Sequence, residues 1–263
     1  MRQRQIHIPR VMIPNAVTAL GVFFGYLSIL YTFEDQYVVA AWLIVIAGLL
    51  DLMDGRVARA VGGTSKFGGY FDSLADAINY GVAPSLLFYR AYLADWGALG
   101  ATFSFLPILC GAIRLARFNV LTDETGKDDY FLGLPTTAAA GFLASYVLFA
   151  HELFGNYGPA NLAAALLAIA SLLMVSGVPY EHNSGFTRRS WKAGMLIVML
   201  ATLLLFPARA LFPWIAFYVS YGLIRGVILT LRDEQGNARE PTILAGHRRR
   251  VGRCLAPATA PEK

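Results

Sequence analysis

Eight apolar segments, each near the length that a helix needs to cross a bilayer, constrain the fold of this chain more than any other feature. About 20 apolar residues in a helix span the hydrocarbon core. Hydrophobic residues make up 56% of the 263 positions, and the mean hydropathy of +0.51 exceeds that of an ordinary soluble domain. The sequence therefore predicts an all-α, polytopic transmembrane helical bundle of about eight spans, near residues 14–33, 37–60, 68–93, 97–120, 135–154, 160–178, 192–207 and 210–231.

The last 30 or so residues differ in composition from the spans. They are charged and rich in Gly and Pro, which is typical of a flexible tail. We therefore expect two parts, a transmembrane domain over residues 1–232 that would hold any active site and a flexible cytoplasmic tail over residues 233–263.

Basic residues divide unevenly between the two sides of the predicted bundle. Lys and Arg are retained on the cytoplasmic side of a membrane. One side holds only Arg90 and Arg209. The other, with both chain termini, holds Arg2, Arg4, Arg10, Arg56, Arg59, Lys66, Arg114, Arg117, Lys127, Arg188, Arg189 and Lys192. Both termini are therefore predicted to be cytoplasmic, and the net charge of +5 reflects topology and contact with anionic lipids rather than nucleic-acid binding.

Four aspartates interrupt this apolar pattern at helical spacing. Asp51 and Asp54 are three residues apart, and Asp72 and Asp76 are four apart, so each pair lies on one helix face. Two packed helices could thus direct four carboxylates to one point near the inner membrane surface. Placing charged carboxylates in the membrane costs free energy, so a positive charge or a hydrogen-bond donor must stabilise them. Hard divalent ions such as Mg²⁺ or Mn²⁺ prefer oxygen ligands, and a pair of them can neutralise both oxygens of a phosphoryl transfer.

The residues around the acids suit a phosphate-bearing ligand. Gly55 and Ala58 leave little side chain on the helix face beside the acids, which would let a nucleotide approach the backbone. Arg59 offers a forked cation to phosphate oxygens. Ser65 belongs to a Gly-rich turn before the next helix, whose exposed amides favour an anion.

Three alternative roles for the four acids explain fewer of the surrounding residues than a metal and phosphate site does. Acids and arginines could simply pair inside the bundle, but four acids face only one close Arg and one Lys. A divalent cation transporter would explain carboxylates in the membrane, yet not the adjacent Gly and Arg, nor the gathering of all four acids at one face. An intramembrane aspartyl protease would need only two of them.

The acidic segment resembles the CDP-alcohol phosphotransferases, whose signature is D-x-x-D-G-x-x-A-R, a short spacer, and G-x-x-x-D-x-x-x-D. Every position is met, by Asp51, Asp54, Gly55, Ala58, Arg59, Gly68, Asp72 and Asp76. The resemblance implies a membrane enzyme whose four aspartates bind two divalent ions. It further implies that the CDP group lies over Gly55, Ala58 and Arg59, that Asp76 is the general base, and that the enzyme is a homodimer.

The signature does not specify the acceptor alcohol, so we look for acceptor-binding residues in the next predicted spans. Arg114 and Arg117 lie one turn apart on one helix face, where they could bind a carboxylate or a phosphate, or merely extend toward the head groups. The run R-L-A-R-F-N ending at Asn119, with F-x-G-L-P-T ending at Thr136, resembles the phosphatidylserine synthase branch of the family. It implies CDP-diacylglycerol as donor and L-serine as acceptor, with these four residues as candidate contacts. Glycerol 3-phosphate, inositol phosphate and choline remain alternative acceptors.

The first span adds two polar candidates and a small-residue pattern. Asn15 and Thr18 could hydrogen-bond near the nucleotide, although Asn15 could equally be an N-cap. Gly21 and Gly25 have the G-x-x-x-G spacing of a helix contact, which we interpret as a packing feature. A compact chain with an inner-side site fits a bacterial cytoplasmic membrane.

Overall fold

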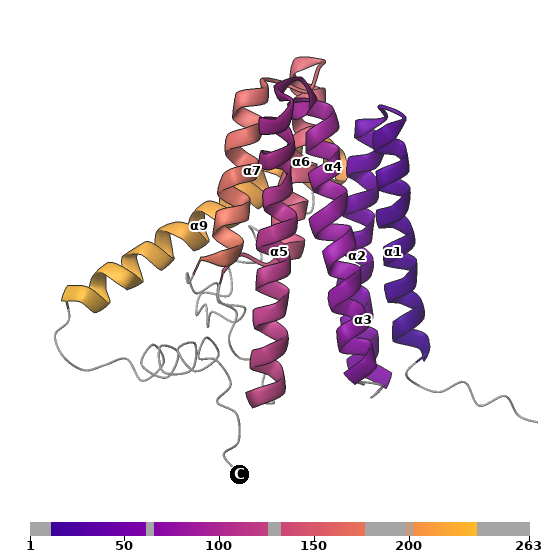
Figure 1. Ribbon diagram of the computed structural model, residues 1–263, viewed down its shortest axis with the longest axis vertical. Coiled ribbons are helices and arrows are strands. Elements are labelled where there is room, and N and C mark those ends of the chain that lie inside the picture. Colours follow the sequence, from indigo (N-terminus) through magenta and orange to yellow (C-terminus); the bar gives the residue numbers. More distant parts are fainter. Residues whose placement is uncertain (1–11, 62–65, 126–132, 177–198, 200–201, 236–263) are drawn as a thin grey trace, which may run out of the picture. The chain divides into compact units, whose positions relative to one another are not determined.

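The computed structural model describes residues 12–61, 66–125, 133–176, 199 and 202–235. Helices make up nearly all of this part, and no strand occurs within it (Figure 1). The predicted all-α class is therefore confirmed for the described residues. In chain order the helices are α1 Met12–Phe33, α2 Tyr37–Val61, α3 Lys66–Asp76, η1 Ala77–Val82, α4 Ala83–Phe88, η2 Tyr89–Leu93, η3 Ala94–Trp96, α5 Ala98–Thr125, α6 Thr136–Phe154, α7 Ala160–Val175 and α9 Pro207–Gln235.

Four of these helices are long and apolar enough to cross a membrane, at Pro14–Phe33, Tyr37–Arg56, Ala98–Val120 and Thr136–Phe154. Their bounds agree closely with four predicted spans. Helix α7 is apolar but shorter, and most of the predicted span 192–207 lies outside the described residues. The chain is thus a membrane protein with several spanning helices.

The predicted span over residues 68–93 differs from a regular helix. It is a helical path of α3, η1, α4 and η2, in which η1 and η2 are π-helical. Pro84 lies in the first turn of α4 and has no backbone N–H to donate, so a regular ladder of hydrogen bonds cannot pass through it. The wider turn of η1 lies directly between Asp76 and helix α4.

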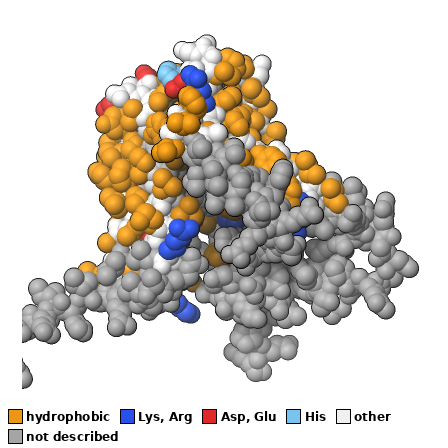
Figure 2. All heavy atoms as spheres, turned by 180° about the vertical axis from the view of Figure 1, so that it is seen from behind, with side chains coloured by type: hydrophobic (Ala, Val, Ile, Leu, Met, Phe, Trp, Pro, Cys, Tyr) orange, Lys and Arg blue, Asp and Glu red, His pale blue; other side chains and the backbone are white. Residues whose placement is uncertain are grey.

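The helical path from α3 to η2 lies at the centre of the helix packing. Helix α1 packs along α2 and touches α3 and η1, while α5 packs against α7 and η1, and α2 against α6. Small side chains line these contacts, and Ala40, Ala47, Ala83 and Ala140 are completely buried. Such residues let helix backbones approach closely in a bilayer. Large apolar side chains instead cover much of the outer surface of the described helices (Figure 2), as expected for contact with lipid.

The chain divides into two compact units, Met1–Gly222 and Leu223–Lys263. The boundary falls within α9, and the second unit is described only as far as Gln235. The predicted tail over residues 233–263 therefore lies almost entirely outside the described residues. Its separation from a domain over residues 1–232 stays a prediction.

Candidate metal and phosphate site

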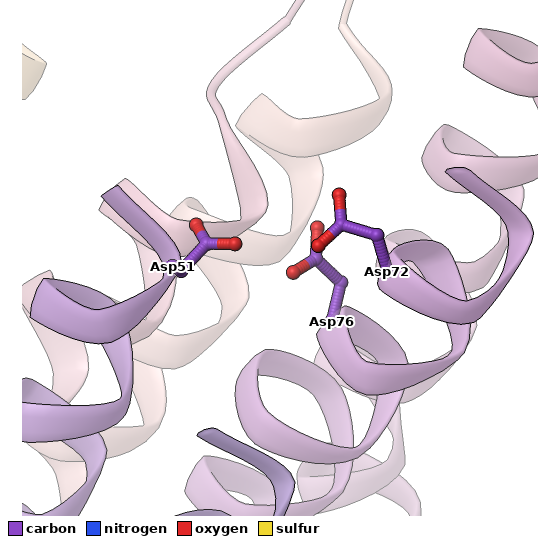
Figure 3. A group of neighbouring side chains, drawn as sticks. All are labelled: Asp51, Asp72 and Asp76. Atoms are coloured by element: carbon purple, nitrogen blue, oxygen red, sulfur yellow. The ribbon is translucent and has the colours of Figure 1, made fainter. Parts of the chain in front are cut away.

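Three of the four predicted acids gather between two helices. Asp51 comes from α2, and Asp72 and Asp76 come from α3. Each offers a carboxylate oxygen, and these oxygens all lie within 4.8 Å of one another. Figure 3 shows Asp51 directed across the gap toward the two carboxylates of α3. The helical spacing of the α3 pair, together with the packing of α1 against both α2 and α3, accounts for this convergence.

Asp54 belongs to the same pocket but has its own partner. It is 7% exposed, and its Oδ2 accepts a hydrogen bond of 2.9 Å from the Thr18 hydroxyl of α1. All four acids line one pocket, with Thr18, Gly21, Ala47, Ala75 and Asn79. The prediction that α2 and α3 direct four acids to one place thus agrees with the structure, in which the three-residue cluster lies beside Asp54.

The four acids form no ion pair among the described side chains. The recorded ion pairs are Arg90–Asp35 at 2.7 Å and Arg209–Glu152 at 3.0 Å. Neither involves an acid of the pocket. Neutral contacts are present instead, since Thr137 donates a hydrogen bond of 3.4 Å to Asp51. Grouped carboxylates in a membrane protein that form no ion pair are stabilised by an added positive charge, such as a bound metal ion.

The oxygen cluster fits a divalent cation. Ligands on one octahedral Mg²⁺ ion with bonds of about 2.1 Å lie roughly 3 to 4 Å apart. Carboxylate oxygens within 4.8 Å of one another need only small shifts to reach that spacing. Their hard, anionic oxygens suit Mg²⁺ or Mn²⁺ and do not distinguish between them.

The candidate acceptor residues lie on the side of the acids formed by α5 and α6. Arg114 of α5 is 7% exposed, its Nε has no hydrogen-bond partner among the described residues, and its charge interacts with that of Asp76. Asn119 accepts a hydrogen bond of 3.1 Å from Ser73, which lies between the two acids of α3. Asn119 is thus hydrogen-bonded to the acidic helix, and Arg114 interacts with it through charge.

Arg117 and Thr136 are placed differently. Arg117 reaches the last turn of α7, where Nη1 lies 3.5 Å from the Val175 carbonyl oxygen. Thr136 is buried at the first position of α6, next to the Thr137 that contacts Asp51. Arg117 is therefore tied to a helix end, whereas Thr136 lies in the turn that supports the cluster.

The predicted nucleotide side is described only in part. Gly55 is exposed, and no atom of the described side chains or backbone would lie within 4 Å of a Cβ added there. Gly68 lies in the first turn of α3. The side chains of Ala58 and Arg59, and all of Ser65, lie outside the described residues. The open face at Gly55 leaves room for a bulky ligand group.

The position of Asn15 in α1 corrects the interpretation of this residue as an N-cap. Asn15 lies inside α1, which already includes Met12, so it is not an N-cap. It is half-buried, one turn before Thr18. The N-cap interpretation was wrong because the helix extends further toward the N-terminus than the apolar segment does.

Several residues at the site were not predicted from the sequence. Ser73, Asn79 and Thr137 carry no signal apart from their nearness to the acids or to Thr136. Tyr80 is buried and donates a hydrogen bond of 3.2 Å to the Ala47 carbonyl oxygen of α2. These contacts depend on how helices pack, which spacing along one segment does not reveal.

Comparisons with known proteins agree with this geometry. The family description of CDP-alcohol phosphatidyltransferases matches residues 11–179. A CDP-diacylglycerol–serine O-phosphatidyltransferase of Helicobacter pylori is 40% identical over 231 residues, covering 85% of this chain and 94% of the relative. A Mycobacterium bovis protein of the same name is 33% identical over 79% of this chain and 73% of its own length. An archaetidylserine synthase of Methanothermobacter thermautotrophicus is 37% identical over 66% and 72%.

The matched region contains every acid of the pocket and the helices that hold them, from α1 to α7. The match extends over well more than half of the chain, and the relatives align along most of their own length. The chain belongs to the CDP-alcohol phosphatidyltransferase family.

Proposed function

We propose that this protein transfers the phosphatidyl group of CDP-diacylglycerol to the hydroxyl of L-serine, giving phosphatidylserine and CMP. The observation that carries the proposal is the cluster of Asp51, Asp72 and Asp76, whose oxygens lie within 4.8 Å of one another in a membrane protein of this family. The names of the relatives supply the donor and the acceptor.

The four aspartates form the metal site in this proposal. Asp51, Asp54, Asp72 and Asp76 would hold two divalent ions, Mg²⁺ or Mn²⁺, which when bound neutralise charge on the donor diphosphate and on the departing CMP. Thr18 orients Asp54 through its hydrogen bond, and Thr137 contacts Asp51. The exposed backbone at Gly55, with Ala58, Arg59, Ser65, Gly68 and Asn15, would lie along the CDP group.

Asp76 is the proposed general base. Its carboxylate would take the proton of the serine hydroxyl as that oxygen forms a bond to the phosphorus bearing diacylglycerol. The bond from this phosphorus to the CMP oxygen breaks in the same displacement, and CMP leaves with the electron pair. Phosphorus keeps its diacylglycerol ester throughout, so atoms and charge balance.

Arg114 favours an acceptor with an anionic group. It is buried, interacts with the charge of Asp76, and has an Nε without a partner among the described residues. A guanidinium in that state would bind a carboxylate or phosphate in a charge-assisted contact. Serine, glycerol 3-phosphate and inositol phosphate offer such a group, whereas choline does not. Arg117, Asn119 and Thr136 are the further candidate acceptor contacts.

The remaining parts of the proposal concern the setting of the enzyme. The active site and both termini would face the cytoplasm, as the uneven distribution of Lys and Arg predicts. The membrane would be a bacterial inner membrane, and the enzyme would work as a homodimer.

The decisive experiment measures CMP release by the purified protein. The assay supplies CDP-diacylglycerol, Mg²⁺ or Mn²⁺, and one acceptor at a time from serine, glycerol 3-phosphate, inositol 1-phosphate and choline. We expect release with serine alone. Release with a different acceptor would retain the role of the acids and overturn the choice of serine, whereas ion transport without CMP release would favour the cation transporter.

A substitution of the proposed base sharpens this test. Asp76→Asn should lower serine-dependent CMP release by roughly 100-fold or more, because it removes proton transfer at the attacking oxygen. Asp95→Asn, a matched change at an exposed position of η3, should retain the activity of the unmodified protein. Normal turnover by Asp76→Asn would refute its role as base.

A further inference from the structure

Asn79 is a buried polar residue of the site that has no part in the proposed reaction. It lies in η1, three residues after Asp76, is 4% exposed, and lines the same pocket as the four acids. Its carboxamide oxygen Oδ1 is buried and has no hydrogen-bond partner in the part of the chain that the structure describes. A buried amide oxygen without a partner is destabilising unless another molecule satisfies it.

Two glycines of α1 make room for this side chain. A Cβ at Gly25 would overlap Oδ1 of Asn79 and would lie 3.0 Å from its Cγ. A Cβ at Gly21 would lie 3.5 Å from its Nδ2. The carboxamide therefore packs directly against the α1 backbone, with Nδ2 beside Gly21 of the pocket lining and Oδ1 beside Gly25, one turn further along α1. The G-x-x-x-G spacing thus accommodates a polar side chain as well as a helix contact.

The π-helical turn fixes where Asn79 points. Helix η1 begins at the residue after Asp76, and its wider turn rotates the following residues relative to a regular α-helix. Asn79 then faces α1, while the next residue, Tyr80, bonds to α2. Consecutive residues thus hold the Asp76 end of α3 against both neighbouring helices.

We propose that Asn79 is a further residue of the metal site, whose carboxamide turns by half a rotation about its Cβ–Cγ bond so that the oxygen faces the pocket and serves the hydrated divalent cation held by the aspartates. Hard cations accept neutral amide oxygens as ligands, and Mg²⁺ keeps several water molecules that must donate hydrogen bonds. An amide oxygen meets either need without adding a fifth negative charge to the pocket. The proposal rests on the proposed function only in requiring that the acids bind a divalent cation.

The test is equilibrium binding of Mn²⁺ to the purified, donor-free protein, followed by electron paramagnetic resonance of the free ion. Asn79→Ala should raise the Kd for Mn²⁺ by about tenfold or more, as loss of a partner near a metal commonly does. Asn79→Asp, which keeps an oxygen in place, should restore binding. Circular dichroism and size exclusion select variants that retain the fold.

The glycine provides an independent check. Gly25→Ala should weaken Mn²⁺ binding because the new methyl group displaces the carboxamide. The double variant Gly25→Ala with Asn79→Ala should bind no more weakly than Asn79→Ala alone, since the displaced group is then absent. Gly141→Ala in α6 is the matched control, because its Cβ would make an ordinary contact of 3.6 Å with Ile215.

Three outcomes would overturn the inference: unchanged Mn²⁺ affinity of folded Asn79→Ala, fully additive losses in the double variant, or no Mn²⁺ binding by the unmodified protein. The proposed function fails in a different way. If the unmodified protein binds Mn²⁺ and Asn79→Ala weakens that binding, but serine releases no CMP, the acceptor is wrong and the role of Asn79 holds.

Discussion

At the scale of single residues, a small charged group fixes the turn between α1 and α2. Asp35 adopts a left-handed backbone with φ of 59°, and its Oδ1 accepts hydrogen bonds of 2.6 Å from the Tyr37 hydroxyl and 2.7 Å from Arg90. The Tyr37 hydrogen bond and then the Arg90 guanidinium lower the pKa of Asp35. The carboxylate therefore contributes stability above its unfolded pKa, which is lost as pH falls through the folded value.

Asp35→Asn should remove this contribution while keeping the turn, because Asn tolerates the left-handed region. We expect a modest loss in Tm at pH 7 that begins to shrink as the pH falls below about 4, the usual pKa of an aspartate, and disappears once the pH has fallen through the lower pKa of folded Asp35. Thermal unfolding in detergent across pH measures it, with Asp95→Asn as the control. An equal loss at every pH would show that the charge has no part in it.

At the scale of elements, the short connection into α6 holds the cluster from the side. Gly133 has φ of 83°, and a Cβ there would overlap the Met174 carbonyl oxygen and lie 2.9 Å from that of Ser176. The next residue, Leu134, donates a backbone hydrogen bond of 2.9 Å to Leu173. The end of α7 thereby sets where α6 begins and where Thr137 meets Asp51.

Gly133→Ala should destabilise the protein by about 1–3 kcal/mol, since it combines backbone strain with a steric clash. Gly155→Ala separates the two causes, because Gly155 also has a positive φ, of 65°, but no atom of the described residues would lie within 4 Å of its Cβ. We expect Gly133→Ala to lose more Tm and more serine-dependent CMP release than Gly155→Ala. Equal losses in the two variants would show that the contact between Gly133 and the end of α7 does not affect stability or activity.

The elements also show what sequence could and could not predict. Spans such as Tyr37–Arg56 and Thr136–Phe154 were predicted to within a few residues, since bilayer thickness fixes their apolar length. The acid spacing predicted the convergence of Asp51 and Asp72. The contact from Thr18 to Asp54 was not predicted, because it depends on packing between helices distant in sequence. The π-turn at η1 was not predicted either, since Pro84 indicates a break in the helix but not the kind of turn.

At the scale of the whole molecule, the predicted orientation can be tested from both sides of the membrane. Lys66 and Asp95 are exposed and mark opposite ends of the helical path from α3 to η3. In a Cys254→Ala background, an impermeant maleimide should label Lys66→Cys only in inverted vesicles and Asp95→Cys only in right-side-out vesicles. The buried Cys110 should stay unlabelled. The reverse pattern would place the acids on the outer side.

The length of α7 has a consequence for the surrounding lipid. Its 16 residues rise by about 24 Å, while the hydrocarbon core of a bilayer is about 30 Å thick. Ser176 leaves the helical conformation directly after it. The sequence predicts a span at α7, and a spanning helix of this length makes adjacent lipids compress, so we expect the leaflets to thin beside it. Diffusing lipids would then meet a locally lowered head-group plane near the Val175 carbonyl that Arg117 contacts.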